Sequence, residues 1–148
     1  QNPVFFEFDP DGRIWVVEYQ GYMLDVQGRG EGDPICRVVV LEDTDHDGRA
    51  DKSTVFLDRL VMPRSLSFVP GGILLQEPPK VWFCADADGD LRCDRRTEVG
   101  TLGVAGNPQH TANGLRYGID NWLHSADGPV RHRWRDGRLI AEATGHRG

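Results

Sequence analysis

Two short segments rich in aspartate occur in the same register, 43 residues apart. The first reads DTDHDGRAD over residues 43–51, and the second reads DADGDLRCD over residues 86–94. Alternate carboxylates on a short loop converge on one point, and Ca²⁺ is the oxygen-seeking cation that tolerates such a flexible loop. A period near 43 residues also matches the length of one four-stranded propeller blade. This feature therefore predicts both a metal and a repeated β-architecture.

The predicted Ca²⁺ ligands are the four aspartates of each segment. They are Asp43, Asp45, Asp47, Asp51, Asp86, Asp88, Asp90 and Asp94. The first segment has Gly48 at the sharp turn, whereas Leu91 occupies that position in the second. Neither has glutamate at the twelfth position, and no long amphipathic helix is expected beside them, which favours a rigid structural site over a regulatory EF-hand. The alternative is a solvated acidic turn whose aspartates only cap local backbone amides.

Glycine and proline are frequent, with 18 and 9 among 148 residues, and the hydrophobic fraction is only 39%. This composition favours many short strands over long helices. Short β-rich runs separated by turn residues form three groups of four, over residues 4–57, 66–99 and 114–142. We therefore predict an all-β fold, with residues 1–148 forming one partial β-propeller domain of about three four-stranded antiparallel blades. Because the smallest propellers have four blades, the predicted propeller is incomplete, as in a fragment of a longer one.

The alternating direction of the strands sorts the loops of each predicted blade onto two faces. Loops after the first and third strands share one face, which includes both aspartate segments. Loops after the second and fourth strands share the other face, which includes a glycine-rich segment (19–35) and residues 100–113. The polar residues expected on this second face are Arg64, Glu77, His110, Asn113 and Arg147. The tryptophans expected to pack between sheets are Trp15, Trp82, Trp122 and Trp134.

The charge and the sequence motifs limit which partners the chain can bind and which cellular compartment suits it. The net charge is −6 and there is no basic stripe, which argues against a nucleic-acid partner. No apolar run approaches the ~20 residues that span a bilayer, so no membrane span is expected in this chain. The Ca²⁺ motifs favour an extracytoplasmic location, either periplasmic or secreted.

The three cysteines allow two arrangements. Cys84 and Cys93 flank the second aspartate segment and could bridge it, which would leave Cys36 free; three unbridged thiols are the alternative.

One histidine stands out as a candidate catalytic residue. His110 lies in NPQHTANGLRYGIDNWLH (107–124), just before the first strand of the third group and at the predicted inner rim of the channel. A histidine at this place can accept a proton from a substrate hydroxyl near neutral pH. The other reading is an ordinary exposed loop histidine.

The segments LVMPRSLSFVPGGILLQE and HTANGLRYGIDNWLHSADG resemble the soluble quinoprotein glucose/sorbosone dehydrogenase propellers. The residues that match the second motif of that family at the same spacing are His110, Leu115, Gly118 and Asp120. Together with LEDTDHDGRADKSTVFLDRL, these segments are similar to one branch in particular, the membrane-bound dehydrogenases described in Planctomycetes and related bacteria. The resemblance covers nearly the whole chain.

This resemblance implies a redox enzyme that uses pyrroloquinoline quinone (PQQ). His110 would be the general base on an alcohol or hemiacetal hydroxyl while hydride passes to PQQ. The candidate cofactor-binding residues are Arg64, Gln109, Asn113 and Arg147, of which the arginines suit a quinone that carries three carboxylates. The chain departs from the family pattern at Gln109, where glucose dehydrogenases place a carboxylate, and at Asn113-Gly114, which replaces Gly-Arg. The implied partners are a small sugar or alcohol substrate and, as electron acceptor, a cytochrome c.

Two other functions fit the same sequence. A non-enzymatic propeller with structural Ca²⁺ would bind glycans or partner proteins through residues 19–35. A Ca²⁺-dependent propeller hydrolase, such as a lactonase, would need carboxylates around a metal in the channel. The aspartates are predicted on the opposite face from the candidate ligand site, which argues against the hydrolase.

Overall fold

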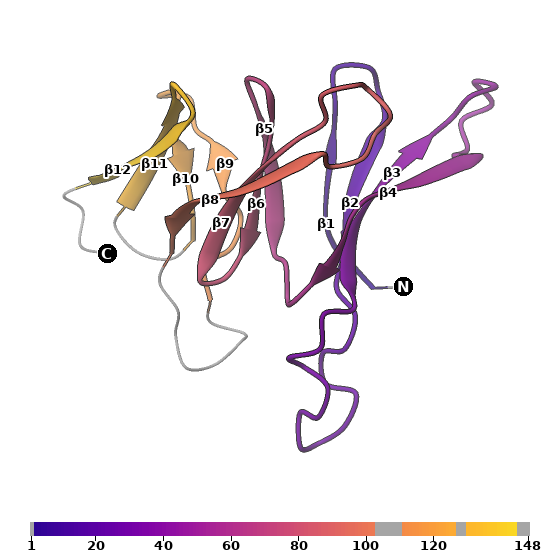
Figure 1. Cartoon of the computed structure of the whole chain (residues 1–148), viewed down its shortest axis with the longest axis horizontal. Coiled ribbons are helices and arrows are strands. Elements are labelled where there is room, and N and C mark those ends of the chain that lie inside the picture. The colour runs from indigo at the N-terminus through magenta and orange to yellow at the C-terminus, as the bar shows by residue number, and fades with distance from the viewer. Residues whose placement is uncertain (1, 103–110, 127–129, 145–148) are drawn as a thin grey trace.

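The computed structural model describes residues 2–102, 111–126 and 130–144. In these residues twelve strands form three four-stranded sheets, and each strand within a sheet pairs with its neighbours along the chain (Figure 1). All of the pairings are antiparallel. No helix in this part of the chain is long and apolar enough to cross a membrane. The predicted all-β, incomplete propeller-like architecture is confirmed.

The first sheet consists of β1 (Pro3–Phe8), β2 (Ile14–Glu18), β3 (Cys36–Glu42) and β4 (Lys52–Leu60). The second consists of β5 (Ser65–Val69), β6 (Gly72–Glu77), β7 (Lys80–Ala85) and β8 (Arg95–Thr101). The third consists of β9 (Arg116–Tyr117), β10 (Leu123–His124), β11 (Val130–Arg135) and β12 (Arg138–Ala143). The three sheets thus coincide with the three predicted groups of strands.

The first two strands of the third sheet are shorter than expected. β9 and β10 have two residues each, whereas the sequence pattern predicts strands over 114–117 and 121–125. Gly114 has a φ of 69° and Asn121 a φ of 58°, so the backbone leaves the extended region at the start of each predicted strand. Trp122 consequently precedes β10 instead of lying within it.

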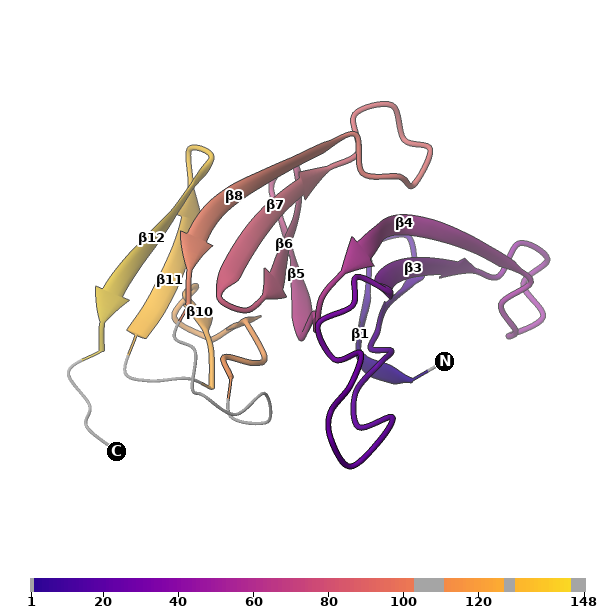
Figure 2. The same ribbon diagram turned by 60° about the horizontal axis from the view of Figure 1, so that its bottom comes forward.

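The second sheet lies between the first and the third (Figure 2). An apolar core fills the space between each pair of neighbouring sheets. The first core joins the first two sheets, and the second core joins the second and third. β6 serves both, because successive side chains of a strand point to opposite faces. Ile73 and Leu75 enter the first core, whereas Leu74 enters the second. All three side chains are almost completely buried.

Three of the four tryptophans pack against a core between two sheets. Trp15 is buried in the first core, with ring centroids 4.6 Å from Phe56 and 5.3 Å from Phe68 of the next sheet. Trp82 packs at the edge of the same core. Trp134 stacks on Phe83 of the second sheet at 4.8 Å.

The fourth tryptophan has a different environment. Trp122 lies beneath two guanidinium groups of its own sheet, with the Cζ atoms of Arg131 and Arg133 at 4.3 and 4.1 Å from the ring centroid. Cation–π contacts of this kind cover the ring on that side.

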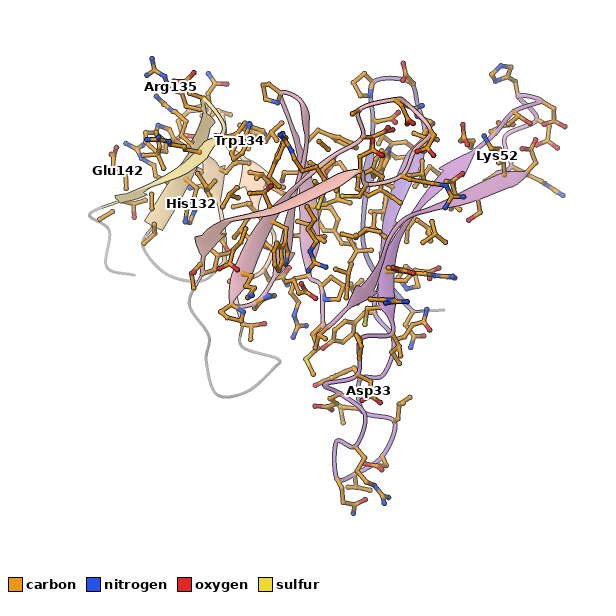
Figure 3. All side chains as sticks on the ribbon, in the orientation of Figure 1. Asp33, Lys52, His132, Trp134, Arg135 and Glu142 are labelled. Atoms are coloured by element: carbon orange, nitrogen blue, oxygen red, sulfur yellow. The ribbon has the colours of Figure 1, made fainter. Side chains whose placement is uncertain are left out.

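The loops divide between two ends of the sheets in the predicted way. In Figure 1 the turns after β1, β3, β5 and β7 lie at the top, whereas the segment between β2 and β3 extends at the bottom. Figure 3 marks the two ends with Lys52, beside the first aspartate segment, and Asp33, in the long loop after β2. We call these ends the aspartate face and the opposite face.

Candidate functional site

The first aspartate loop connects β3 to β4 on the aspartate face. Asp43, Asp45 and Asp51 each present one carboxylate oxygen, and the three oxygens lie within 4.8 Å of one another. Asp47, the fourth predicted ligand, is not part of this cluster. Its Oδ1 accepts a hydrogen bond from the backbone N–H of Arg49 at 2.8 Å.

Backbone hydrogen bonds hold the clustered carboxylates of this loop in place. The N–H of Gly48 donates to Asp43 Oδ2 at 2.9 Å, and both the N–H and the hydroxyl of Thr44 donate to the Asp51 carboxylate. His46 and Gly48 take positive φ angles of 62° and 87°, which turn these donors inward. The alternation of aspartates with turn residues therefore produces a compact acidic loop.

The second aspartate loop, between β7 and β8, repeats several backbone hydrogen bonds of the first. The N–H of Leu91 donates to Asp86 Oδ2 at 2.9 Å, and the N–H of Ala87 donates to Asp94 Oδ2 at 2.7 Å. Positive φ angles occur at the equivalent positions, 82° at Gly89 and 64° at Leu91. The clustered carboxylates are again three, Asp86, Asp88 and Asp94. The fourth, Asp90, accepts from the N–H of Arg92 at 2.9 Å, as Asp47 does from Arg49.

Leu91 anchors the second loop to the protein core, which the sequence reasoning missed. Its positive φ costs roughly 1–2 kcal/mol relative to a right-handed conformation. Its side chain is only 7% exposed and belongs to the first core, and burial of a leucine contributes about 1.5–3 kcal/mol. The sequence feature that could have indicated this anchoring role is the leucine itself, a large apolar residue in a polar loop.

The second loop also reaches across to the first sheet (Figure 2). The N–H of Cys93 donates to the carbonyl oxygen of Phe56 in β4 at 2.9 Å. The loop therefore contacts two sheets at once, through this hydrogen bond and through Leu91 in the shared core.

The donor set of both loops fits a hard cation such as Ca²⁺. All clustered donors are carboxylate oxygens, and Ca²⁺ takes six to eight oxygen ligands, including water and backbone carbonyls. Partial dehydration acts to raise the pKa of Asp43, but hydrogen bonds from the backbone amides of Gly48 and Asp47 outweigh it and lower that pKa. Asp43 is therefore ionised, as a cation ligand must be.

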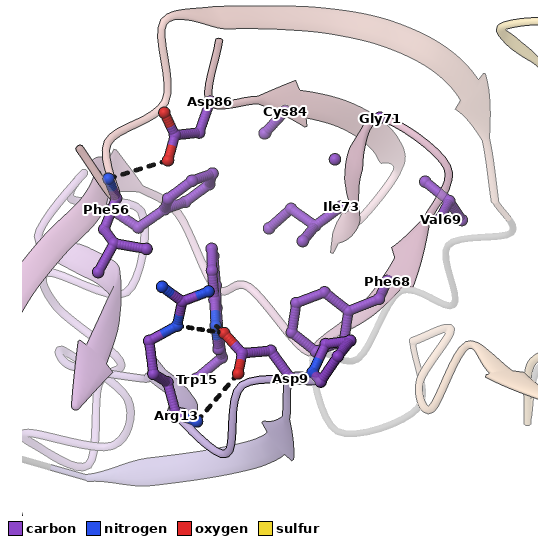
Figure 4. Close-up of a pocket in the computed structure, with 13 residues that line it drawn as sticks. Asp9, Arg13, Trp15, Phe56, Phe68, Val69, Gly71, Ile73, Cys84 and Asp86 are labelled. Carbon is purple, nitrogen blue, oxygen red and sulfur yellow. Dashed lines mark hydrogen bonds and ion pairs between the residues drawn. The ribbon is translucent and has the colours of Figure 1, made fainter. Parts of the chain in front are cut away.

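Next to the aspartate loops, an apolar pocket of about 380 Å³ opens between the first two sheets (Figure 4). Trp15, Ile73 and Cys84 line it, and an ion pair between Asp9 and Arg13 lies at its rim. Burial acts to raise the pKa of Asp9, but hydrogen bonds from Trp15 Nε1 and from Arg13 lower it overall. These contacts close the β1–β2 turn against the core and explain the buried carboxylate.

The two cysteines that flank the second loop share the first core, Cys84 within it and Cys93 packed against it. Both are free thiols. Interaction with Cys93, together with burial, raises the pKa of Cys84, whereas interaction with Cys84 lowers the pKa of Cys93 to about 7. Cys36 lies elsewhere, in β3, and its Sγ donates to the carbonyl oxygen of Gln20 at 3.1 Å.

On the opposite face, the structure describes two of the predicted cofactor-binding residues. Arg64 lies between β4 and β5, with its guanidinium Cζ 4.9 Å from the centroid of the Tyr19 ring. Asn113 is exposed just before β9, and its carbonyl oxygen accepts hydrogen bonds from the N–H of Ala126 and the hydroxyl of Ser125. The other predicted residues of this site, His110, Gln109 and Arg147, lie outside the described residues.

A buried polar network joins the second and third sheets beside these two residues. Gln76 is fully buried at the end of β6; its Oε1 accepts from the hydroxyl of Ser65, and its Nε2 donates to Ser125 Oγ at 3.3 Å. The N–H of Leu115 donates to both Ser65 Oγ and Gln76 Oε1, at 3.2 and 3.3 Å. The segments that follow Arg64 and Asn113 are therefore held together. The sequence reasoning missed this network, although a glutamine within an apolar strand pattern was a signal for it.

Comparison with known proteins finds one family that matches almost the entire chain. The model of one protein family, described as Domain of unknown function (DUF7133), matches residues 1–144. No curated protein matches the chain. The family match spans all three sheets and both aspartate loops, almost the entire chain. The chain therefore belongs to the DUF7133 family.

Proposed function

We propose that this chain is the metal-stabilised propeller portion of a PQQ-dependent dehydrogenase that oxidises a sugar or an alcohol. The observation that carries the proposal is the separation of two kinds of site. The carboxylate clusters lie on the aspartate face, whereas Arg64 and Asn113 lie on the opposite face, where the network around Gln76 holds their segments together. The motif resemblance around His110 supplies the chemistry.

In this proposal the two aspartate loops bind structural Ca²⁺. Each loop would hold the ion through three clustered carboxylates, with water or backbone oxygens completing the coordination. The charge of the ion attracts the three close carboxylates and offsets most of their mutual repulsion, so the ion stabilises the turn. A catalytic metal as in a hydrolase is disfavoured, because both clusters lie on the other face from the polar cluster at Arg64 and Gln76.

The residues of the opposite face have separate roles in the proposed reaction. When bound, PQQ supplies an electrophilic quinone that accepts a hydride. Arg64 offers a guanidinium for one of its carboxylates, and Gln109, Asn113 and Arg147 are further candidates for binding. His110 takes the proton from the substrate hydroxyl as the general base. A cytochrome c is the proposed electron acceptor, and the location is extracytoplasmic.

PQQ titration of the intact natural protein tests this proposal, with tryptophan fluorescence as the readout and with Ca²⁺ present or chelated. Saturable binding is expected, and Arg64→Gln should weaken it by about tenfold or more, because a charge-assisted hydrogen bond is lost. Arg49→Gln is the matched control, since Arg49 is an exposed arginine in the first aspartate loop. His110→Ala should keep PQQ binding but lower turnover by about 10²–10⁴-fold. Turnover that survives this change would exclude the proposed base.

A second function, recognition of glycans or partner proteins without catalysis, is favoured by one observation. The loop between β2 and β3 extends from the opposite face (Figure 1) and exposes four large apolar side chains. Met23, Leu24 and Val26 are 64%, 67% and 96% exposed, and Ile35, at the end of the loop, is 46% exposed. This function predicts no PQQ binding while Ca²⁺ still raises the melting temperature. It also predicts that the protein binds a glycan on an array or a protein partner. The double substitution Leu24→Ser and Val26→Ser should abolish this binding.

A further inference from the structure

The second aspartate loop has a pair of thiols at its base. Cys84, in β7, is fully buried in the first core, and Cys93 packs against that core from a partly exposed position. The two side chains thus face the same core, and each thiol shifts the pKa of the other. A disulfide requires Cβ atoms about 3.5–4.5 Å apart, a separation suited to two side chains that share one core at the base of a closed loop.

The backbone holds the two ends of this loop together independently of the thiols. The N–H of Asp94 donates to the carbonyl oxygen of Ala85 at 2.9 Å, and the β7–β8 ladder continues with the pair Ala85 and Arg95. The N–H of Cys93 is bound to the carbonyl oxygen of Phe56 in the neighbouring sheet. These contacts hold both ends of the loop in place, so a bond between the two cysteine side chains would not require the strands to move.

The first aspartate loop provides an internal comparison. At the positions equivalent to Cys84 and Cys93 it has Leu41 and Ala50, although its hydrogen bonds and positive φ angles match those of the second loop. The thiol pair is therefore not a requirement of the aspartate loop itself. It is an addition to the loop that connects two sheets.

We propose that Cys84 and Cys93 form a reversible dithiol–disulfide pair whose oxidised form covalently closes the second aspartate loop. Cys36 stays a thiol, because it lies in β3 and is hydrogen-bonded to Gln20. The disulfide would enclose Asp86, Asp88 and Asp90 in a short ring and hold Leu91 in the core. The proposal does not depend on PQQ or on catalysis.

The oxidant in this proposal is a small-molecule disulfide, with oxidised glutathione as the probe. The sulfur of Cys93, the more exposed of the two, attacks one glutathione sulfur, so the glutathione S–S bond breaks and one glutathione thiol leaves. The sulfur of Cys84 then displaces the second glutathione and forms the intramolecular S–S bond. The two thiol protons of the protein end on the two glutathione thiols, and the two electrons lost by the protein sulfurs reduce the glutathione disulfide.

Thiol counting on the intact protein tests the proposal. After equilibration with oxidised or reduced glutathione, the protein is denatured in acid, alkylated and mapped by mass spectrometry of its peptides. One free thiol, at Cys36, is expected after oxidation, with a disulfide-linked peptide pair containing Cys84 and Cys93. Oxidation should raise the melting temperature by about 5–10 °C, since a ring of this size restricts the unfolded chain.

Two cysteine variants distinguish the proposed pair from other sources of a redox effect. Cys93→Ser should abolish the redox dependence of the melting temperature, whereas Cys36→Ala should retain it. The peptide map of the unaltered protein does not depend on whether either variant folds. Three free thiols after oxidation, a lasting glutathione adduct on Cys93, or a disulfide that includes Cys36 would each overturn the proposal.

Discussion

At the scale of single residues, Leu91 shows how a departure from a motif is compensated. The sequence pattern calls for glycine there, and Gly48 fills the position in the first loop with a φ of 87°. Leu91 adopts a φ of 64° because its side chain enters the first core. Neither the backbone conformation nor the burial follows from the loop sequence, because the core that accepts the side chain is built by residues of two sheets.

Leu91→Ala should lower the free energy of unfolding by about 2–4 kcal/mol, because it removes a buried side chain and keeps the strained backbone. Chemical denaturation with Ca²⁺ at a fixed concentration measures this change. Gly48→Ala is the matched control, since it strains the equivalent position in the first loop without removing packing, and should cost only about 1 kcal/mol. Equal effects of the two substitutions would show that Leu91 does not act as an anchor.

His132 should make the protein less stable in mild acid. Burial of its imidazole, together with the nearby His124, lowers its pKa below the ordinary value of 6.5. The unfolded chain therefore binds the proton more readily, and the stability contribution is complete above about pH 6.5 and declines as the pH falls towards the folded-state pKa. Urea denaturation at several pH values should show this decline, and His132→Phe should reduce it. His46→Asn, in the exposed first loop, should leave the decline unchanged.

At the scale of elements, the sequence predicted the strands well because their turns and their packing leave local patterns. Asp-Gly and Gly-Gly turns fix the hairpins, and alternate apolar residues mark strands such as β2 and β6. β9 and β10 were predicted too long, since the positive φ of Asn121 is set by its turn and not by strand propensity. The structure clusters three of the four predicted metal ligands in each loop, and the fourth accepts a hydrogen bond from a backbone amide. The spacing of aspartates alone does not distinguish these two roles.

Aspartates inside and outside the carboxylate cluster should differ in their effect on metal affinity. Asp43→Asn should weaken Ca²⁺ binding at the first loop by tenfold or more, because Asp43 belongs to the carboxylate cluster. Asp47→Asn should have a smaller effect, since Asp47 lies outside the cluster and accepts from Arg49. Isothermal titration with Ca²⁺ measures both. If neither loop binds Ca²⁺ below millimolar concentration, the aspartates serve only to cap the turn.

At the scale of the whole molecule, the arrangement of sheets and faces followed from the sequence, whereas the contacts between sheets did not. A period of 43 residues and the alternation of strand direction placed both aspartate loops on one face. The network of Gln76, Ser65 and Ser125 depends on residues that are distant in sequence, and no local pattern specifies their partners. The predicted base, His110, lies outside the described residues, so its role stays a prediction.

Gln76→Leu should lower the free energy of unfolding by about 1–3 kcal/mol, although leucine is the more apolar residue. The substitution removes the acceptor of Ser65 and one acceptor of the Leu115 N–H at a buried site, which leaves polar groups without full hydrogen bonding. Thermal and urea unfolding measure the change, and Gln27→Leu in an exposed loop is the control. A stabilised Gln76→Leu protein would show that the network does not contribute to the interface.

The alternation of side chains along β6 has a consequence for how the molecule opens. Among the described residues, each apolar core is shared by two sheets, and β6 contributes to both cores. Separating the sheets at one core exposes apolar surface on both sides of the break, so neighbouring sheets are energetically coupled. Amide hydrogens of β6 should therefore exchange with solvent only through complete unfolding, and those of β1 and β12, each paired on one edge only, should exchange through smaller fluctuations.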